Sequence, residues 1–518
     1  MKTLFAATIL FQLATVLPSH AGEKPNIIVI LADDMGFSDL GCYGSEIETP
    51  NLDKLAADGL RFTNFYNTSR CCPTRAALLT GLYPHQAGVG AMTADEGENR
   101  PGYRGRLNRN CVTLAEAIKP AGYTTLMAGK WHVGDGEGMK PVDRGFDRYW
   151  GVLHGGGIYF KETLQLKPER VFYKDGTPIE TPDDLYVTDD FTDRSMDFID
   201  EAVKEKKKPF FLYLAYIAPH WPLQAKPKDI EKYKGRYNEG WDVVRDKRFA
   251  KQKQLGVISE NTLLSPRDPE AKAWNEMSEE KRKDLAHRME IYAAQVDCID
   301  QNIGRLVAKL KETGQFDNTL ILFLSDNGCS AEGGPGGFSK GKKDAPIGTG
   351  LSYASVGLEW ANVSDTPFRK FKMHTHEGGT ATPFIAHWPA GITNKGEIRK
   401  TVGHVIDVMP TLLDVAKADY PKQVAGKEIK PHEGVSLMPS FKSDAAGSER
   451  TLYWEHFGKK AVRRGDWKAV SGEKNTWHLY HLKDDPSELN DLAKNEPAKL
   501  KEFKELWQTW AKRCDVLK

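Results

Sequence analysis

Short, unbroken runs of apolar residues recur along the chain, and each run gives way at once to polar residues. The clearest runs cover residues 26–31, 124–127, 209–217 and 319–324. Apolar runs of this length without alternation are typical of strands that are buried on both faces of a parallel sheet. The pattern therefore predicts a buried strand at each of these positions.

Helical patterns lie between these runs. We expect helices at residues 51–58, 74–80, 113–121, 192–204 and 281–314. Alternation of buried strands and helices predicts an α/β fold, with a large domain built on a central, mostly parallel sheet flanked by helices. Ligands bind such sheets beyond the carboxyl ends of the strands, so the polar residues that follow each run are the candidates for a site.

The pattern changes after about residue 423. Short candidate strands at 451–456, 460–463, 467–470 and 477–482 precede a helix at 497–512. This predicts a catalytic domain at 22–422 and a C-terminal subdomain at 423–518 with a small antiparallel sheet and a helix. Within the large domain, we expect residues 226–279 to form a polar, helical surface insertion and the glycine-rich residues 333–362 to form a long loop.

The N-terminus has the features of an export signal. Lys2 precedes an apolar stretch at 4–17, and Ser19, His20 and Ala21 offer a cleavage site. We therefore expect a signal peptide at 1–21 and a periplasmic or secreted protein. No later run is long and apolar enough to predict a membrane span, and a formal net charge of +1 argues against a nucleic-acid partner.

Acidic side chains follow two of the predicted strands. Asp33 and Asp34 end the first, and Asp326 and Asn327 follow the last. Three carboxylates and an amide are hard oxygen ligands, which suit Ca²⁺ or Mg²⁺ better than zinc. Either pair alone could simply cap the turn that follows it, but two pairs at strand ends favour a metal site.

Cationic groups occupy similar positions. Lys130 and His132 lie in GKWHVG, His220 lies in APHWP, and Lys370 and Lys372 precede HEGG. A single lysine is usually a solvated surface charge, and a single histidine is usually a hydrogen-bonded side chain. Several at strand ends, beside a candidate cation site, indicate a pocket for a multiply charged anion.

The adjacent thiols of Cys71 and Cys72 need a separate explanation. Seven cysteines is an odd number, so at least one is unpaired or used chemically. A disulfide between neighbours is strained, and the nearest other cysteines, Cys42 and Cys111, do not offer the spacing of a zinc site.

These motifs together resemble those of the type I sulfatases, a formylglycine-dependent family of the alkaline phosphatase superfamily. CCPTRAALLTG is similar to the family signature Cys-x-Pro-x-Arg, and GKWHVG to its second signature. NIIVILADDMG, SDNG and HEGG match further landmarks between residues 25 and 388, and LKDDPSELNDLA matches a tail motif. The likeness is greatest to bacterial arylsulfatases.

The resemblance implies that Cys71 is oxidised to formylglycine, an aldehyde, by a formylglycine-generating maturation enzyme. Pro73 and Arg75 belong to the segment that this enzyme reads, and Cys72 fills a variable position. The resemblance also implies a Ca²⁺ site, with Mg²⁺ as the alternative. Its ligands would be Asp33, Asp34, the modified Cys71, Asp326 and Asn327.

The implied reaction is the hydrolysis of a sulfate ester. One hydroxyl of the hydrated aldehyde attacks sulfur, with Asp326 as base, and the second hydroxyl later expels sulfate. His220, together with Lys372, would protonate the leaving alcohol, and His132 would deprotonate the second hydroxyl. Lys130, His220 and Lys372 would bind the sulfate oxygens, and Arg75 would orient the hydrate.

Two other functions fit the same motifs. The chain could hydrolyse phosphonate monoesters or phosphodiesters, or it could be a non-catalytic relative that binds sulfated glycans. The substrate of a sulfatase would be an aryl or, more in keeping with export, a carbohydrate sulfate ester. Residues that could recognise the sugar are His154, Tyr159, Trp221 and the 333–362 loop, whereas we expect His374 and His376 to be rim or packing residues.

Overall fold

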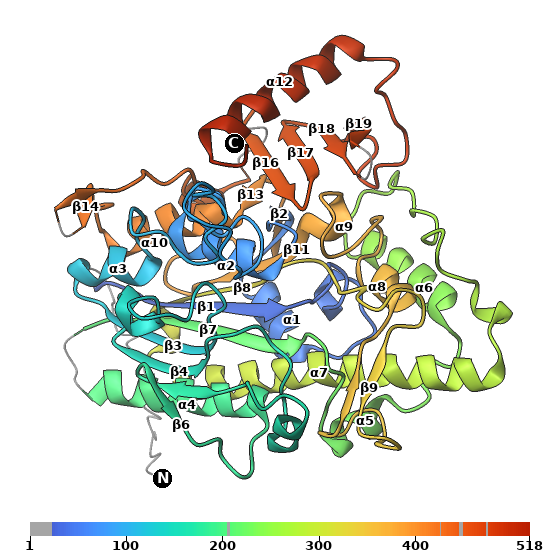
Figure 1. Ribbon diagram of the computed structural model, residues 1–518, viewed down its shortest axis with the longest axis horizontal. Coiled ribbons are helices and arrows are strands. Elements are labelled where there is room, and N and C mark those ends of the chain that lie inside the picture. Colours follow the sequence, from blue (N-terminus) through green and yellow to red (C-terminus); the bar gives the residue numbers. More distant parts are fainter. Residues whose placement is uncertain (1–22, 205–207, 425, 445–448, 473–474, 518) are drawn as a thin grey trace, which may run out of the picture.

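The computed structural model describes residues 23–204, 208–424, 426–444, 449–472 and 475–517. The predicted signal peptide at 1–21 lies outside these ranges. Figure 1 shows a large sheet between layers of helices, with a smaller sheet and a helix placed at one end. No helix in the described ranges is long and apolar enough to cross a membrane.

The described residues form a central sheet of 11 strands in the order β12-β2-β11-β8-β1-β7-β3-β4-β5-β6, with β13 also paired to β2. Strands β8, β1, β7, β3 and β4 are all parallel, which confirms the predicted mostly parallel sheet. The strands are β1 (Asn26–Asp33), β2 (Leu60–Tyr66), β3 (Thr124–Lys130), β4 (Arg148–Val152), β5 (Phe172–Lys174), β6 (Thr177–Ile179), β7 (Phe210–Pro219), β8 (Thr319–Ser325), β11 (Ala381–His387), β12 (Glu397–Arg399) and β13 (Gly403–His404).

Alternate side chains of the buried strands enter two separate cores. In β1, Ile28 and Ile30 pack on one face of the sheet, while Ile27, Val29 and Leu31 pack on the other. The first core is covered by α1 (Pro50–Ala57), α4 (Val187–Lys204) and α7 (Glu279–Glu312), and the second by α2 (Cys71–Thr80), α3 (Leu114–Ile118) and α10 (Val408–Ala416). Burial on both faces explains why the strand sequences lack alternation.

The expected surface insertion is helical but is not superficial. It contains α5 (Pro227–Tyr233) and α6 (Trp241–Gln254). Trp241 is buried, and the buried guanidinium of Arg248 lies 2.6 Å from the Asp39 carboxylate and 2.8 Å from that of Glu46. The charge of this segment suggested exposure, but part of that charge is paired inside the protein.

The prediction of an irregular loop at 333–362 is wrong in part. The segment contains a hairpin of β9 (Ser339–Gly341) and β10 (Ser352–Ala354), and its end enters α8 (Leu358–Ser364). Each strand of this hairpin has only three residues, which is too short for periodicity to reveal among the surrounding glycines.

The C-terminal sheet and helix are found as predicted. The antiparallel sheet runs β16-β17-β18-β19, and Trp454 of β16 donates a hydrogen bond to the Asn67 carbonyl of the large domain at 2.7 Å. The domain boundary at 422/423 stays a prediction. The elements here are β14 (Gln423–Val424), β15 (Lys427–Glu428), α11 (Met438–Lys442), β16 (Thr451–His456), β17 (Lys459–Arg464), β18 (Trp467–Ser471), β19 (Trp477–His481) and α12 (Pro497–Arg513).

Candidate active site

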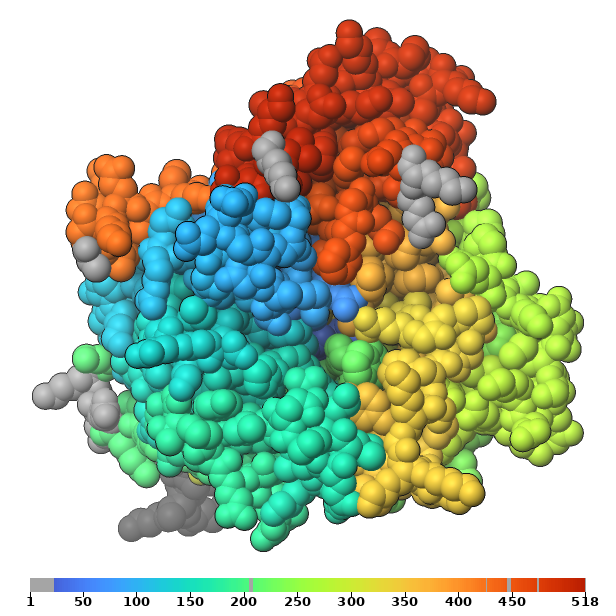
Figure 2. All heavy atoms as spheres, in the orientation of Figure 1, coloured from blue at the N-terminus to red at the C-terminus, as the bar shows by residue number. Residues whose placement is uncertain are grey.

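The predicted site residues meet at one edge of the central sheet. The neighbouring parallel strands β8, β1, β7 and β3 each carry some of these residues at or just after their carboxyl ends. Figure 2 shows that the surface is hollowed near the centre of the face viewed. The set is completed from two other places, the first turn of α2 and the segment before α9 (Glu377–Thr380). In chain order its members are Asp33, Asp34, Cys71, Arg75, Lys130, His132, His220, Asp326, Asn327 and Lys372, and all are buried.

The acidic residues form one connected cluster. Arg75 donates from Nη2 to Asp33 at 3.1 Å and to Asp326 at 2.9 Å, so its guanidinium ties the end of β1 to the end of β8. Asn327 donates from Nδ2 to Asp34 Oδ1 at 2.7 Å. Asp34 itself has a left-handed backbone, with φ of 66°, which aspartate tolerates better than most residues. This turn directs two adjacent carboxylates into the same site.

The cluster has the properties of a hard-cation site. Asp33 Oδ1 and Asn327 Oδ1 are buried and have no hydrogen-bond partner among the described residues, although buried oxygens are normally paired. Burial, together with the negative charge of Asp33, raises the pKa of Asp326 well above its usual range. Both observations indicate missing positive charge, and the all-oxygen donors fit Ca²⁺ or Mg²⁺.

Cys71 lies at the first position of α2, with only 2% of its surface exposed. The backbone N–H of Thr68 and the Thr74 hydroxyl oxygen, 3.0 Å apart, brace this helix end. A hydrogen bond with Cys72 and the nearby charge of Lys130 lower the pKa of the Cys71 thiol despite its burial. The start of α2 thus favours negative charge at Cys71.

His132 lies beside the thiol pair. Its Nε2 is 3.2 Å from Cys72 Sγ, so Cys72 is in contact with the site rather than remote from it. Burial lowers the pKa of His132 to about 4. The imidazole is therefore neutral near pH 7 and can accept a proton.

The glycine segment 155–157 passes against the two site histidines. A Cβ atom on Gly155 would lie 2.9 Å from Cε1 of His132, and one on Gly156 would lie 3.4 Å from Nδ1 of His220. The first distance is shorter than van der Waals contact, so the absence of a side chain at Gly155 lets the His132 ring take its position. The second is an ordinary contact distance, and the atom that would obstruct a side chain at Gly156 is Ile217 Cγ2, at 2.8 Å.

Replacing Gly155 with alanine is expected to lower kcat at least about tenfold, because the new methyl group displaces the His132 ring from its productive position. The fold should be retained, since the atoms displaced belong to a side chain. Steady-state kinetics and thermal unfolding of Gly155→Ala would measure both quantities. Gly472→Ala is the control, because its Cβ would meet only His376 Cε1 at 3.9 Å. Unchanged kcat in Gly155→Ala would contradict the assigned packing.

His220 and Lys372 lie on the opposite side of the acidic cluster. His220 Nδ1 is 2.6 Å from the Trp221 carbonyl, which only accepts, so Nδ1 carries a proton. Its Nε2 points toward Asp34 Oδ2 at 3.5 Å. Lys372 Nζ lies 2.8 Å from the Asp34 carboxylate. Lys130 Nζ forms the corresponding ion pair with Asp33, so each aspartate at the end of β1 has its own lysine.

Two further residues, missed in the sequence, complete the charge network. Glu332 pairs with Arg70 at 3.0 Å and with Lys372 at 3.3 Å, and accepts a hydrogen bond from Trp221 Nε1. Burial opposes ionisation, but Lys372 and Arg70 lower the pKa of Glu332. The only signals available were proximity to motifs, since Arg70 precedes Cys71 and Glu332 follows SDNG.

The other candidate residues from the sequence lie outside the catalytic set. Tyr159 is buried and donates to the His220 carbonyl at 2.7 Å, so of its two possible roles, sugar recognition or structural support, the structure favours support of His220. His154 is partly exposed and lies 3.2 Å from Asp135. His376 is buried, and Lys370 pairs with Asp268 at 2.8 Å, which leaves Lys372 as the lysine of the site.

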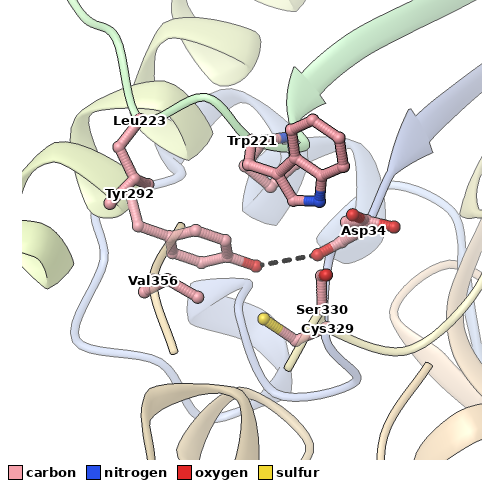
Figure 3. Close-up of a pocket in the computed structure, with 8 residues that line it drawn as sticks. Asp34, Trp221, Leu223, Tyr292, Cys329, Ser330 and Val356 are labelled. Atoms are coloured by element: carbon pink, nitrogen blue, oxygen red, sulfur yellow. Dashed lines mark hydrogen bonds between the residues drawn. The ribbon is translucent and has the colours of Figure 1, made fainter. Parts of the chain in front are cut away.

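A small void lies behind Asp34. Figure 3 shows the Tyr292 hydroxyl, which donates to the Asp34 carbonyl at 3.1 Å, with the Trp221 ring near the same aspartate. The void has a volume of about 10 Å³, enough for no more than about one water molecule. The void is therefore too small to hold a substrate.

The site combines oxygen donors that suit a cation with buried lysine, arginine and histidine groups and with a cysteine at a helix N-terminus. This combination is typical of an enzyme that hydrolyses anionic esters. The Sulfatase family model matches residues 25–418, and a model of the C-terminal region of N-sulphoglucosamine sulphohydrolase matches 368–513. The chain belongs to the sulfatase family and is a sulfuric ester hydrolase.

Individual relatives agree with this assignment. The chain is 38% identical to an arylsulfatase of Klebsiella aerogenes over 84% of this chain and 96% of that protein. It is 36% identical to an uncharacterized sulfatase of Schizosaccharomyces pombe over 96% and 95%. Among solved structures, Ps i-CgsB in complex with k-i-k-neocarrahexaose is 28% identical, with a TM-score of 0.70 and coverage of 94% and 93%.

Proposed function

We propose that the protein removes sulfate from a carbohydrate sulfate ester, using a formylglycine formed from Cys71 and a divalent cation. The observation that supports this most strongly is the arrangement around Cys71, where the helix N-terminus, Lys130 and His132 surround a buried side chain. The formylglycine hydrate supplies a hydroxyl nucleophile that is regenerated in each cycle. The maturation enzyme would be a required partner.

The cation, Ca²⁺ with Mg²⁺ as the alternative, would be held by Asp33, Asp34, Asp326 and Asn327 together with the modified Cys71. Bound there, it would act as a Lewis acid and supply positive charge to the sulfate group. The side-chain cations alone do not neutralise a bound sulfate, because Arg75, Lys130 and Lys372 are already paired with Asp33, Asp34 and Asp326. A further anion therefore needs a further cation.

The proton transfers would be divided among His220, His132 and Asp326. His220 would protonate the leaving alcohol from Nε2, since Nδ1 is held by the Trp221 carbonyl. His132, on the side of Cys71, would take up a proton from the nucleophile residue, and Asp326 would serve as base in the attack. Lys130 and Lys372 would neutralise charge on the sulfate oxygens, while Arg75 would fix the hydrate and the acidic cluster.

Replacing His220 with alanine is expected to lower kcat about 10²- to 10⁴-fold on an alkyl or sugar sulfate. The loss should be much smaller on an aryl sulfate with an acidic phenol, because such a leaving group departs without protonation. Rates on a series of sulfate esters with graded leaving-group pKa would measure this difference. His478→Ala, in the C-terminal sheet, is the control. An equal loss on every ester would contradict the role of acid.

The assignment of a carbohydrate leaving group has two supports. The structural relative Ps i-CgsB binds a neocarrahexaose, and a cavity beside His220 has a volume of about 490 Å³, which accommodates a sugar. The predicted export signal fits an enzyme that meets such substrates in the periplasm or outside the cell. Nothing in the proposed reaction calls for nucleic acid.

Mass spectrometry of the tryptic peptide Cys71–Arg75 tests the nucleophile directly. Protein made together with a formylglycine-generating enzyme should show loss of the Cys71 sulfur and an aldehyde that reacts with a hydrazide probe. Two intact thiols in protein that nevertheless hydrolyses sulfate esters would overturn the formylglycine proposal. Parallel rates on matched sulfate and phosphate esters would expose the alternative activity, because a phosphonate monoester hydrolase, at 19% identity and a TM-score of 0.59, shares the fold.

A further inference from the structure

The cavity of about 490 Å³ lies next to the proposed sulfate site. Two residues belong to both places. Trp221 packs on His220, with 4.5 Å between the ring centroids, and Glu332 contacts Lys372 at 3.3 Å. An alcohol protonated by His220 would therefore lie beside this cavity. Its principal lining residues are Lys167, Trp221, Glu332, Phe338, Lys340 and Tyr353.

One wall of the cavity is aromatic. The Trp221 ring meets Phe338 at 5.4 Å and Tyr353 at 5.7 Å between centroids, each nearly edge to face. Phe338 precedes β9 and Tyr353 lies in β10, so the short hairpin carries two of the three rings. An aromatic wall offers apolar surface and a negative ring face, which suit the C–H groups of a sugar ring.

The cavity also holds unused positive charge. Lys340 lies over the Phe338 ring, its Nζ 5.3 Å from the centroid, and has no carboxylate within 4.0 Å among the described residues. Lys167 lies over Tyr353 at 5.4 Å, and its nearest carboxylate, Glu169, is 3.9 Å away. Glu332 is the one acidic residue of the lining, and its charge is already matched by Arg70 and Lys372.

The hairpin extends this charge outward. Lys342 and Lys343 follow Lys340 at the exposed turn, where Asp344 is the single acidic neighbour. A neutral sugar would gain nothing from this concentration of ammonium groups, whereas a substrate with an additional negative charge would gain affinity.

We propose that this cavity binds the leaving sugar against Trp221, Phe338 and Tyr353, and that Lys167 and Lys340 bind a second anionic group on that sugar or its neighbour. The inference rests on the proposed carbohydrate sulfatase function. It defines the substrate class as a sugar with at least two negative charges, the reacting sulfate and either another sulfate or a carboxylate.

Competitive inhibition tests this inference without requiring that the test sugar be hydrolysed. A small aryl sulfate is the reporter substrate, and three disaccharides that differ only in charge are the inhibitors, at one ionic strength. The first carries one sulfate, the second carries two, and the third carries one sulfate and one carboxylate. At least one doubly charged disaccharide should bind about tenfold more tightly than the first.

Variants then assign the effect to the lysines. Lys167→Ala and Lys340→Ala should each reduce the preference for the doubly charged inhibitor about threefold to fivefold, and Lys340→Glu should abolish it. Lys343→Ala, on the same hairpin but outside the lining, removes only a more distant charge and should reduce the preference less than about twofold. The more effective anion identifies which of the two chemistries the cavity accepts.

The outcomes separate the two proposals. Equal inhibition by all three disaccharides, or a preference that survives Lys340→Glu, would overturn the second-anion subsite while aryl sulfate turnover continued. A protein that carries formylglycine and cation but hydrolyses neither the aryl sulfate nor any of the three disaccharides would instead overturn the proposed function itself.

Discussion

Cys71→Ala is expected to abolish sulfate-ester hydrolysis, with a loss of about 10⁴-fold or more, because the variant lacks the side chain that we propose as the source of the nucleophile. The fold should be retained. Cys71 lies at the start of α2 beside Lys130 and His132, and alanine is compatible with the first turn of a helix. Residual rates and thermal unfolding of the purified variant would measure the two effects.

Cys72→Ala is the matched variant, since it removes the adjacent thiol in the same helical turn. It should keep turnover within about tenfold of the parent, with any loss arising from its contact with His132. If Cys71→Ala kept a substantial share of the activity, or if Cys72→Ala lost as much as Cys71→Ala, the assignment of the nucleophile would be wrong.

Asp326→Ala is expected to weaken cation binding by about 100-fold or more and to remove most activity at ordinary cation concentrations. The carboxylate is fully buried, and its loss also leaves Arg75 with Asp33 as its one remaining carboxylate partner. Asp326→Asn is the companion variant, because it keeps the shape of the side chain and removes only the charge.

The measurement is thermal unfolding after chelation and stepwise return of Ca²⁺ or Mg²⁺, with activity followed in parallel. Cation should raise the Tm of the parent protein and restore its activity, as expected for a ligand of the folded state. It should do neither for the Asp326 variants within the same range. Asp317→Ala, exposed just before the other end of β8, is the control. A parent-like response in Asp326→Asn would refute the ligand set.

The sequence predicted the framework of the site because strand ends are visible in it. Buried parallel strands have apolar runs, and the residues that follow them, such as Asp33, His220 and Asp326, must meet at one edge once the strands are parallel. The same logic missed β2 and β11. Their sequences, LRFTNFY and ATPFIAH, mix polar residues into the run, and β11 is antiparallel to both its neighbours.

What the sequence could not provide is the pairing of charges between distant segments. The sequence neighbours of Arg248 and Glu332 are typical of a protein surface. Each side chain is nevertheless held by an ion-pair partner more than 200 positions away in the chain. Tyr159 illustrates the converse. An aromatic residue near a glycine-rich motif resembles a sugar contact, but the register of its segment turns it inward to the His220 carbonyl.

The burial of α2 imposes an order of events on biosynthesis. Cys71, Pro73 and Arg75, the positions that the maturation enzyme would read, are all buried in the folded protein, so the proposed modification would have to be made before the chain folds. Maturation enzyme added to the folded thiol form should leave Cys71 unconverted. The rate of folding would then compete with the rate of modification, and the proportion of active molecules would be set once, when the chain folds.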